Sequence, residues 1–109
     1  EITVSFGTGG NASKAWPAQA ERDLLRLLTA LGPVVLDGGG SPAELAEAED
    51  RAAQLPVQVV HTTPREFMAR IAASRLYVGY DSAFQHVAAA LGTPVITVLG
   101  EPTAERFHQ

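Results

Sequence analysis

Residues 34–61 read VVLDGGGSPAELAEAEDRAAQLPVQVVH and contain a complete strand–helix–strand unit. An apolar run at 34–37 and a β-branched run at 57–61 are typical of strands. Between them, Ser41-Pro42-Ala43-Glu44 forms a capping box with proline at the first helical position, which predicts a helix over 42–54. Parallel strands need a crossover of this kind, so the unit predicts two parallel strands joined by a helix.

The same alternation extends from this unit in both directions along the chain. Right-handed crossovers then predict a Rossmann-like α/β fold, an open parallel five-stranded sheet of order 3-2-1-4-5 with helices on both faces. The expected strands cover 2–6, 34–37, 57–61, 76–79 and 95–99, and the expected helices cover 18–31, 42–54, 65–74 and 82–91. Thr63-Pro64-Arg65-Glu66 is a second capping box, and Ser82-Ala83-Phe84-Gln85 has the same form without the proline.

Helical periodicity predicts which faces of the helices are buried. In the first helix it places four leucines on one face, and Glu21, Arg22 and Arg26 elsewhere. The leucines are Leu24, Leu27, Leu28 and Leu31. The last helix is apolar nearly all round, so we expect its outer face to be covered by a further segment or domain. Trp16 is expected to shield the start of the first helix.

Composition limits the classes of function. The chain has 109 residues, of which 46% are hydrophobic, so we expect one domain, 1–109, with a packed core. There is no cysteine, and no apolar run is long enough to span a membrane. The net charge of −4 and the scattered arginines argue against a nucleic-acid partner. Because the chain starts on a strand without Met, we interpret it as a fragment of a longer protein.

In open α/β sheets, ligands bind beyond the carboxyl ends of the strands where the strand order reverses. For order 3-2-1-4-5 this point lies between strands one and four, so the loops at 7–14 and 79–82 are the candidate site. The first loop is glycine-rich and ends at Lys14, the only lysine, which favours contact with a phosphate. The alternative is a plain turn in which Lys14 is solvated.

A dinucleotide site is a second interpretation of the first loop. Residues 7–12 fit the pattern G-x-G-x-x-A after a first strand, and Asp37 ends the second strand where a ribose-binding acid belongs. That pattern requires a helix to begin inside the glycine run, whereas Pro17 lies five residues beyond Ala12. An NAD(P)-binding oxidoreductase domain is therefore the alternative and not the main hypothesis.

The second loop leads into a helix with a polar first turn. Capping explains Ser82 and Gln85, but not His86, which lies one turn beyond Ser82 on the same face. An imidazolium beside exposed N–H groups suits a pyrophosphate, and a histidine satisfied by Asp81 or the backbone is the alternative. The three histidines show no metal-ligand spacing, so no metal site is expected.

Three groups of residues, taken in order, resemble the C-terminal domain of the bacterial heptosyltransferases, GT-B glycosyltransferases of lipopolysaccharide core assembly. The resemblance covers nearly the whole chain and is most specific over 81–94. The residues are Ser13-Lys14-Ala15-Trp16-Pro17, Gly38-Gly39-Gly40 with Glu44, and Asp81-Ser82-Ala83-Phe84-Gln85-His86-Val87-Ala88-Ala89-Ala90-Leu91-Gly92-Thr93-Pro94.

The resemblance implies a donor-binding domain that faces an N-terminal acceptor domain holding the catalytic base. The donor would be a nucleotide diphosphate sugar similar to ADP-heptose, with a saccharide or lipopolysaccharide acceptor and no cofactor. The resemblance implies that Gly9, Gly10 and Lys14 bind the donor phosphates and that Glu44 binds the ribose. Asp81 would contact the transferred sugar, and Ser82 and Ala83, beside His86, would bind the pyrophosphate. For Glu44, a capping role is the alternative.

The chain departs from the family pattern at two positions. Ala83 stands where the family usually has glycine, and Phe84 stands where proline or a small aliphatic residue is common. These departures leave the identity of the donor open. A non-catalytic nucleotide-binding or interaction domain is a further alternative. The resemblance and the absence of an export signal imply a cytoplasmic enzyme. If the enzyme is associated with a membrane, we expect it at the inner face of the inner membrane. The isolated fragment is expected to catalyse nothing.

Overall fold

The computed structural model describes residues 1–7, 16–80 and 83–98, and strands and helices alternate throughout this part of the chain. Every predicted strand and helix is present, and most ends lie within two residues of the prediction. The elements are β1 (Ile2–Ser5), α1 (Ala18–Thr29), β2 (Val34–Asp37), α2 (Pro42–Ala52), β3 (Val57–Val60), α3 (Pro64–Ala73), β4 (Leu76–Tyr80), α4 (Ala83–Ala90) and β5 (Val95–Val98).

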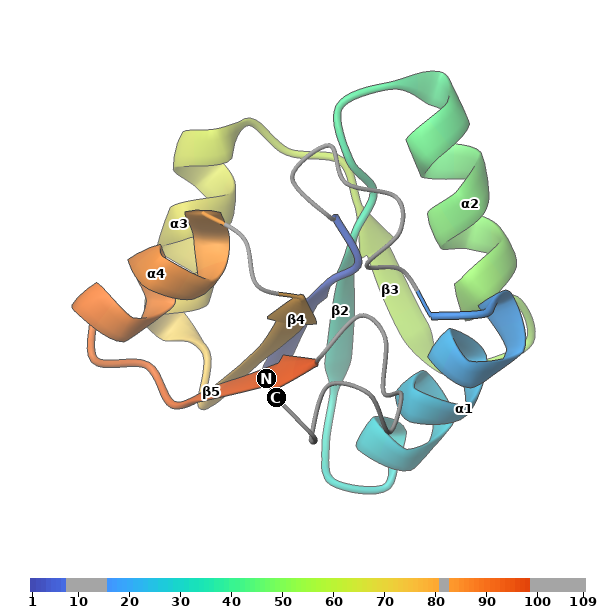
Figure 1. Ribbon diagram of the computed structural model, residues 1–109, viewed down its shortest axis with the longest axis horizontal. Helices are drawn as coiled ribbons and strands as arrows, with labels where there is room; N and C mark the ends of the chain where they lie inside the picture. The colour runs from blue at the N-terminus through green and yellow to red at the C-terminus, as the bar shows by residue number, and fades with distance from the viewer. Residues whose placement is uncertain (8–15, 81–82, 99–109) are drawn as a thin grey trace, which may run out of the picture.

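The strands form one parallel sheet in the order β3-β2-β1-β4-β5, as predicted (Figure 1). The central strand β1 pairs with β2 through Val4 and Leu36, and with β4 through Ser5 and Gly79. All the strands point the same way, so their carboxyl ends lie along one edge of the sheet. The loop that follows each strand therefore begins at that edge.

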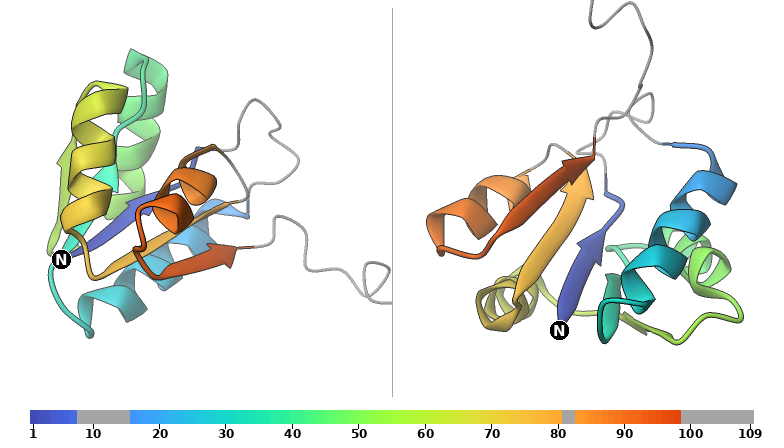
Figure 2. Two further views of the ribbon diagram at one scale, coloured as in Figure 1. Left: turned by 90° about the vertical axis from the view of Figure 1, so that its left-hand side faces the viewer. Right: turned by 90° about the horizontal axis from the view of Figure 1, so that it is seen from below.

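Two helices cover each face of the sheet (Figures 1 and 2). Alternate strand residues point to opposite faces, so Val78 and Tyr80 join one core cluster while Tyr77 joins the other. The larger cluster lies under α1 and α2, and the smaller one lies under α3 and α4. The larger contains Ile2, Val4, Leu25, Leu28, Val34, Leu36, Ala48, Ala52, Val78, Tyr80 and Val98, and the smaller contains Phe67, Ile71, Tyr77 and Ala88.

The predicted buried face of α1 is wrong by part of a turn. Leu27 and Leu31 are 69% and 60% exposed, whereas the buried residues of the helix are Glu21, Leu25 and Leu28. This second stripe has the spacing i, i+4, i+7 and is as helical as the predicted one. In this orientation Glu21 meets polar partners on β4 and α2.

The helix starts follow the sequence signals to different degrees. At α3 the capping box is complete: the Thr63 hydroxyl accepts from the Glu66 amide, and the Glu66 carboxylate accepts from the Thr63 amide. At α2 the Ser41 hydroxyl accepts from the Glu44 amide, but the Glu44 carboxylate bonds Gly40 N–H in place of Ser41 N–H. The third predicted cap, at Ser82, lies outside the described residues.

The fifth strand is less buried than its apolar sequence predicts. In the described part of the chain β5 pairs with β4 alone, and Ile96 is 49% exposed. On α4, Ala88 is fully buried against the sheet while Leu91, just after the helix, is 49% exposed. The outer face of α4 is therefore open within the described residues, and its cover by a further segment stays a prediction.

Candidate functional site

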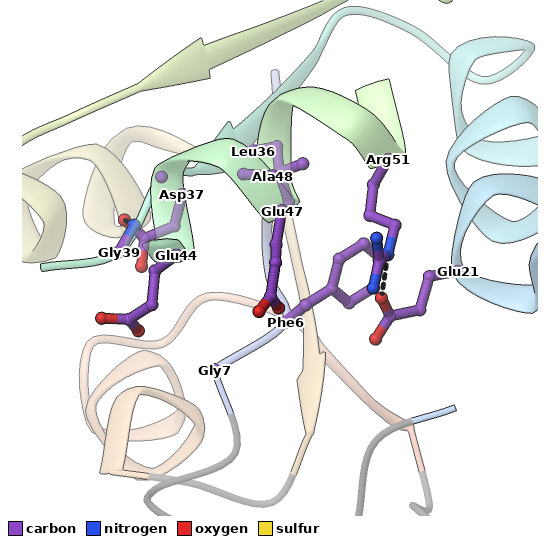
Figure 3. A pocket seen from close by; sticks show the side chains of 11 residues that line it. Phe6, Gly7, Glu21, Leu36, Asp37, Gly39, Glu44, Glu47, Ala48 and Arg51 are labelled. Atoms are coloured by element: carbon purple, nitrogen blue, oxygen red, sulfur yellow. Dashed lines mark hydrogen bonds and ion pairs between the residues drawn. The ribbon is translucent and has the colours of Figure 1, made fainter. Parts of the chain in front are cut away.

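Two pockets open at the carboxyl ends of β1 and β2. The first has a volume of about 240 Å³ and lies between the end of β1 and the inner side of α2 (Figure 3). The second, of about 280 Å³, extends from the same strand ends toward α3 and α4. Gly7, Asp37, Gly39 and Glu44 line both pockets. The candidate site is thus at the edge that the sequence predicts, on the side nearer β2.

The first pocket is strongly acidic. Its lining includes four carboxylates, Glu21, Asp37, Glu44 and Glu47, and one guanidinium, Arg51. Arg51 is paired with Glu21 at 2.9 Å, so its charge is already neutralised (Figure 3). A pocket of this charge repels phosphate and suits a neutral group rich in hydroxyl donors, such as a sugar ring.

Two of the three glycines in the turn between β2 and α2, Gly38 and Gly39, leave no room for a Cβ. Gly38 N–H donates to the Val60 carbonyl at 2.7 Å, and Gly39 N–H donates to the Asp37 carboxylate at 3.1 Å. Gly39 has φ +77°, and a Cβ there would lie 2.5 Å from the Cβ of Glu44. The turn therefore brings its backbone closer to Glu44 than any residue with a side chain would allow.

Glu44 lies at the mouth of both pockets. Its Oε1 accepts hydrogen bonds from Gly40 N–H at 3.2 Å and from the Ser41 hydroxyl at 3.0 Å. Its Oε2 has no hydrogen-bond partner among the described residues, and the side chain is exposed. Glu44 is thus held in place by one oxygen while the other is available to a ligand. The capping and ligand-binding interpretations of Glu44 are compatible in this geometry.

Asp37 is the second acid shared by the pockets. Burial raises the pKa of its carboxyl, the hydrogen bond from Gly39 N–H opposes that rise, and the nearby negative charge of Glu44 adds to it. Two carboxylates held at one pocket mouth favour a ligand that donates hydrogen bonds to them. This is the role that the dinucleotide interpretation gives to Asp37 and that the family resemblance gives to Glu44.

The second pocket has an aromatic wall. Phe67 of α3 and Phe84 of α4 pack edge to face, with ring centroids 4.8 Å apart. Phe84 is one of the two departures from the family pattern, and a small aliphatic residue at this position would not form this ring contact. The pocket therefore combines an aromatic side with the carboxylates of Asp37 and Glu44.

Sequence reasoning missed a buried polar network beside the first pocket. Tyr80 and Glu21 are 1% and 4% exposed, and the tyrosine hydroxyl donates to the Glu21 carboxylate at 2.7 Å. Arg51 donates to the other Glu21 oxygen at 2.9 Å. One sequence feature could have predicted the burial of Glu21: its spacing to Leu25 and Leu28 places it on the same helix face as these two apolar residues.

The predicted phosphate contacts fall largely outside the described residues. The phosphate contacts that lie outside them are Gly9, Gly10, Lys14 and Ser82, and Asp81, the predicted contact to the sugar, lies outside the described residues as well. Ala83 is the first residue of α4, and His86 lies on the same helix, is exposed, and lines neither of the two pockets. Trp16 packs against the larger core cluster beside α1, as expected. Of the contact residues that the family resemblance implies, Glu44 is the one that the structure places at a pocket, and Asp37, the acid of the dinucleotide alternative, lines the same two pockets.

Two further findings concern the described residues. No three His, Asp or Glu side chains among them come together as a metal site. None of their helices has the length and apolar character that crossing a bilayer requires.

An open parallel sheet with a glycine turn and hydroxyl-accepting carboxylates at its carboxyl edge defines an α/β domain of the nucleotide-binding class. The chain belongs to glycosyltransferase family 9 (heptosyltransferase), whose model matches residues 2–108. This membership favours the transferase over the oxidoreductase interpretation.

Solved structures of one heptosyltransferase resemble most of the chain. E. coli heptosyltransferase WaaC with ADP-2-deoxy-2-fluoro heptose is 28% identical with a TM-score of 0.78, over 89% of this chain and 31% of that one. WaaC with ADP is 26% identical with a TM-score of 0.79, over 88% of this chain and 32% of that one. The chain thus spans about a third of WaaC. Comparison with curated protein sequences finds no match.

Proposed function

We propose that the chain is the donor-binding domain of a glycosyltransferase. The donor is a nucleotide diphosphate sugar of the ADP-heptose type, and the acceptor is a saccharide or lipopolysaccharide. An N-terminal domain outside this chain binds the acceptor and supplies the catalytic base. The enzyme acts in the cytoplasm and needs no resident cofactor or metal. Family membership over residues 2–108 supports this function, as does the similarity to WaaC, which was solved with ADP and an ADP-sugar analogue.

The geometry of Glu44 is the observation that carries the proposal. Its Oε2 is available at the mouth of an acidic pocket, while Gly40 and Ser41 hold its Oε1. A carboxylate held this way accepts hydrogen bonds from the hydroxyls of a nucleoside ribose. The aromatic wall formed by Phe67 and Phe84 in the neighbouring pocket offers an apolar surface to a nucleobase.

The charges lining the pockets argue that the diphosphate lies elsewhere. The first pocket repels phosphate, so the proposal assigns the phosphates to Lys14 and the Gly9 and Gly10 backbone, and to the N-terminus of α4 with Ser82 and Ala83. The proposal places His86 of α4 beside these groups. Asp81 contacts the transferred sugar. Lys14 and the helix N-terminus stabilise the departing diphosphate electrostatically.

A ligand panel followed by thermal unfolding tests the proposal. We expect ADP at 100 times its Kd to stabilise the chain by about 2.7 kcal/mol, with no comparable effect of NAD. GDP, UDP and CDP complete the panel and identify the base preferred. Lys14→Ala should abolish the stabilisation, because the ammonium neutralises the phosphates. Glu44→Gln should weaken binding about fivefold, because the hydrogen bond from the ribose is then accepted by a neutral amide oxygen in place of a carboxylate.

Two substitutions outside the pockets serve as matched controls, a cation for Lys14 and a carboxylate of the same helix for Glu44. Arg26→Ala removes a cation of α1, and Glu49→Gln removes a carboxylate of α2, both outside the pocket linings. Neither should change nucleotide binding. Stabilisation by NAD alone would replace the proposal with the oxidoreductase alternative. A panel in which no nucleotide stabilises the chain would contradict the assignment of the donor site to this domain.

A further inference from the structure

Four segments of the chain meet in one buried chain of hydrogen bonds. The Trp16 amide donates to the Tyr80 hydroxyl at 2.6 Å, and that hydroxyl donates to Glu21 Oε2 at 2.7 Å. Arg51 Nε donates to Glu21 Oε1 at 2.9 Å. Tyr80 ends β4, Glu21 lies in the first turn of α1, and Arg51 lies in the last turn of α2. The network therefore joins the sheet to both helices on one of its faces.

The direction of every bond in this network is determined by chemistry. A backbone amide and a guanidinium only donate, and a carboxylate only accepts. The Tyr80 hydroxyl must therefore accept from Trp16 and give its single proton to Glu21. Burial raises the pKa of the Tyr80 hydroxyl further above its already high usual value, so that proton is present throughout the physiological range. The hydroxyl therefore accepts one hydrogen bond and donates one.

Packing alone does not account for the Tyr80 hydroxyl. The ring contacts Phe6, with centroids 6.1 Å apart, and phenylalanine would fill the same space. A buried hydroxyl costs free energy unless it is hydrogen-bonded, so its presence requires the two partners that it has. One of those partners is a backbone amide outside any helix or strand. The specific consequence of the hydroxyl is therefore to hold the backbone at Trp16.

The place of this contact in the sequence links it to the donor site. Trp16 is two residues after Lys14, and Tyr80 immediately precedes Asp81 and Ser82. We propose that Tyr80 is a positioning residue: its hydroxyl holds the backbone at Trp16, just after the loop at 7–14, beside the end of β4. Tyr80 itself does not touch the donor. Glu21 and Arg51 hold the hydroxyl in place. This inference rests on the proposed function, because it assumes that both loops contact the donor.

The test compares Tyr80→Phe with Tyr77→Phe. The second variant is a matched control, because Tyr77 is a fully buried tyrosine on the same strand that belongs to the opposite core cluster. Trp16 is the only tryptophan in the chain, so fluorescence reports on it directly. In Tyr80→Phe we expect stronger quenching of Trp16 by acrylamide and an ADP Kd raised about fivefold. In Tyr77→Phe both quantities should stay at the wild-type level.

The two readouts separate failure of this inference from failure of the proposed function. Unchanged Trp16 quenching in Tyr80→Phe overturns the positioning role. If the wild-type chain binds ADP, an unchanged ADP Kd in Tyr80→Phe overturns it as well. If the wild-type chain binds no nucleotide, the proposed function fails and the donor-site role of Tyr80 fails with it, while quenching still shows whether the hydroxyl holds Trp16. If Tyr80→Phe unfolds at the temperature of the assay, both readouts are taken for it and for Tyr77→Phe at a lower temperature in the presence of a stabilising osmolyte.

Discussion

At the scale of single residues, Gly39 shows how the site depends on backbone conformation. Its φ of +77° is readily adopted by glycine and disfavoured for residues with a Cβ. The missing side chain also makes room for Glu44, which approaches this position from the first turn of α2. A Cβ at Gly40, the next residue, would meet nothing within 4 Å, so the two glycines differ sharply in what they tolerate.

We therefore predict that Gly39→Ala destabilises the chain and weakens nucleotide binding. The left-handed conformation and the contact with Glu44 together should lower the free energy of unfolding by about 1–2 kcal/mol. Displacement of Glu44 should raise the Kd of ADP. Chemical denaturation and calorimetric titration measure the two effects. Gly40→Ala is the control and should change neither quantity; equal effects of the two substitutions would contradict the steric argument.

At the scale of elements, the helices begin where local chemistry directs them. The α3 capping box satisfies amides at the helix start with the side chains of Thr63 and Glu66. Interactions that reach only three residues along the chain need no tertiary contact, so they are readable from the sequence. The helix they start also carries Phe67, which lines the second pocket.

Thr63→Ala should lower the free energy of unfolding by about 1 kcal/mol, because the Glu66 amide loses its acceptor. The neighbouring residue supplies the control. The Thr62 hydroxyl is buried and has no hydrogen-bond partner among the described residues, so Thr62→Ala removes a polar group that is not satisfied. We expect Thr62→Ala to change stability by less than about 0.5 kcal/mol in urea denaturation. A larger loss for Thr62→Ala than for Thr63→Ala would rule out the capping explanation.

Which face of α1 is buried is also decided at the scale of elements. Leucines at several positions of the helix support two overlapping stripes, and periodicity alone does not choose between them. The chosen stripe includes Glu21, an acid that sequence reasoning assigns to the polar face. Its partners are Tyr80, 59 residues away, and Arg51, 30 residues away. No local pattern contains that information.

At the scale of the whole molecule, the ion pair between Glu21 and Arg51 connects two helices across the rim of the first pocket. The Glu21 side chain is 5% exposed and that of Arg51 is 19% exposed. The α1 helix also carries Asp23 and Arg26, an ion pair of the same 2.9 Å length whose side chains are 55% and 54% exposed. The two pairs thus differ in burial and not in length.

Double-mutant cycles should separate these two pairs. For Glu21→Ala with Arg51→Ala we expect a coupling free energy of about 1–3 kcal/mol, because Arg51→Ala leaves the buried Glu21 carboxylate without its cation, and Glu21→Ala leaves Arg51 only the exposed Asp50 as a partner. For Asp23→Ala with Arg26→Ala the coupling should stay below about 0.5 kcal/mol, because solvent screens the exposed pair. Denaturation at low and high salt provides the measurement. Equal couplings would show that burial does not strengthen the Glu21–Arg51 pair.

The sequence by itself determined the order and type of the elements, the sheet topology and the carboxyl edge as the place of the site. These follow from short apolar runs, capping residues and the handedness of crossovers, all of which act locally or by general rule. It also named Glu44 as a candidate, which the structure places at two pockets, while the contact of Glu44 with a ribose stays a prediction. Tertiary structure alone decided which face of α1 is buried, that Asp37 and Glu44 share two pockets, and that Tyr80 reaches Trp16 and Glu21. Those features depend on contacts between residues far apart in the chain, whose partners are chosen only when the helices pack on the sheet.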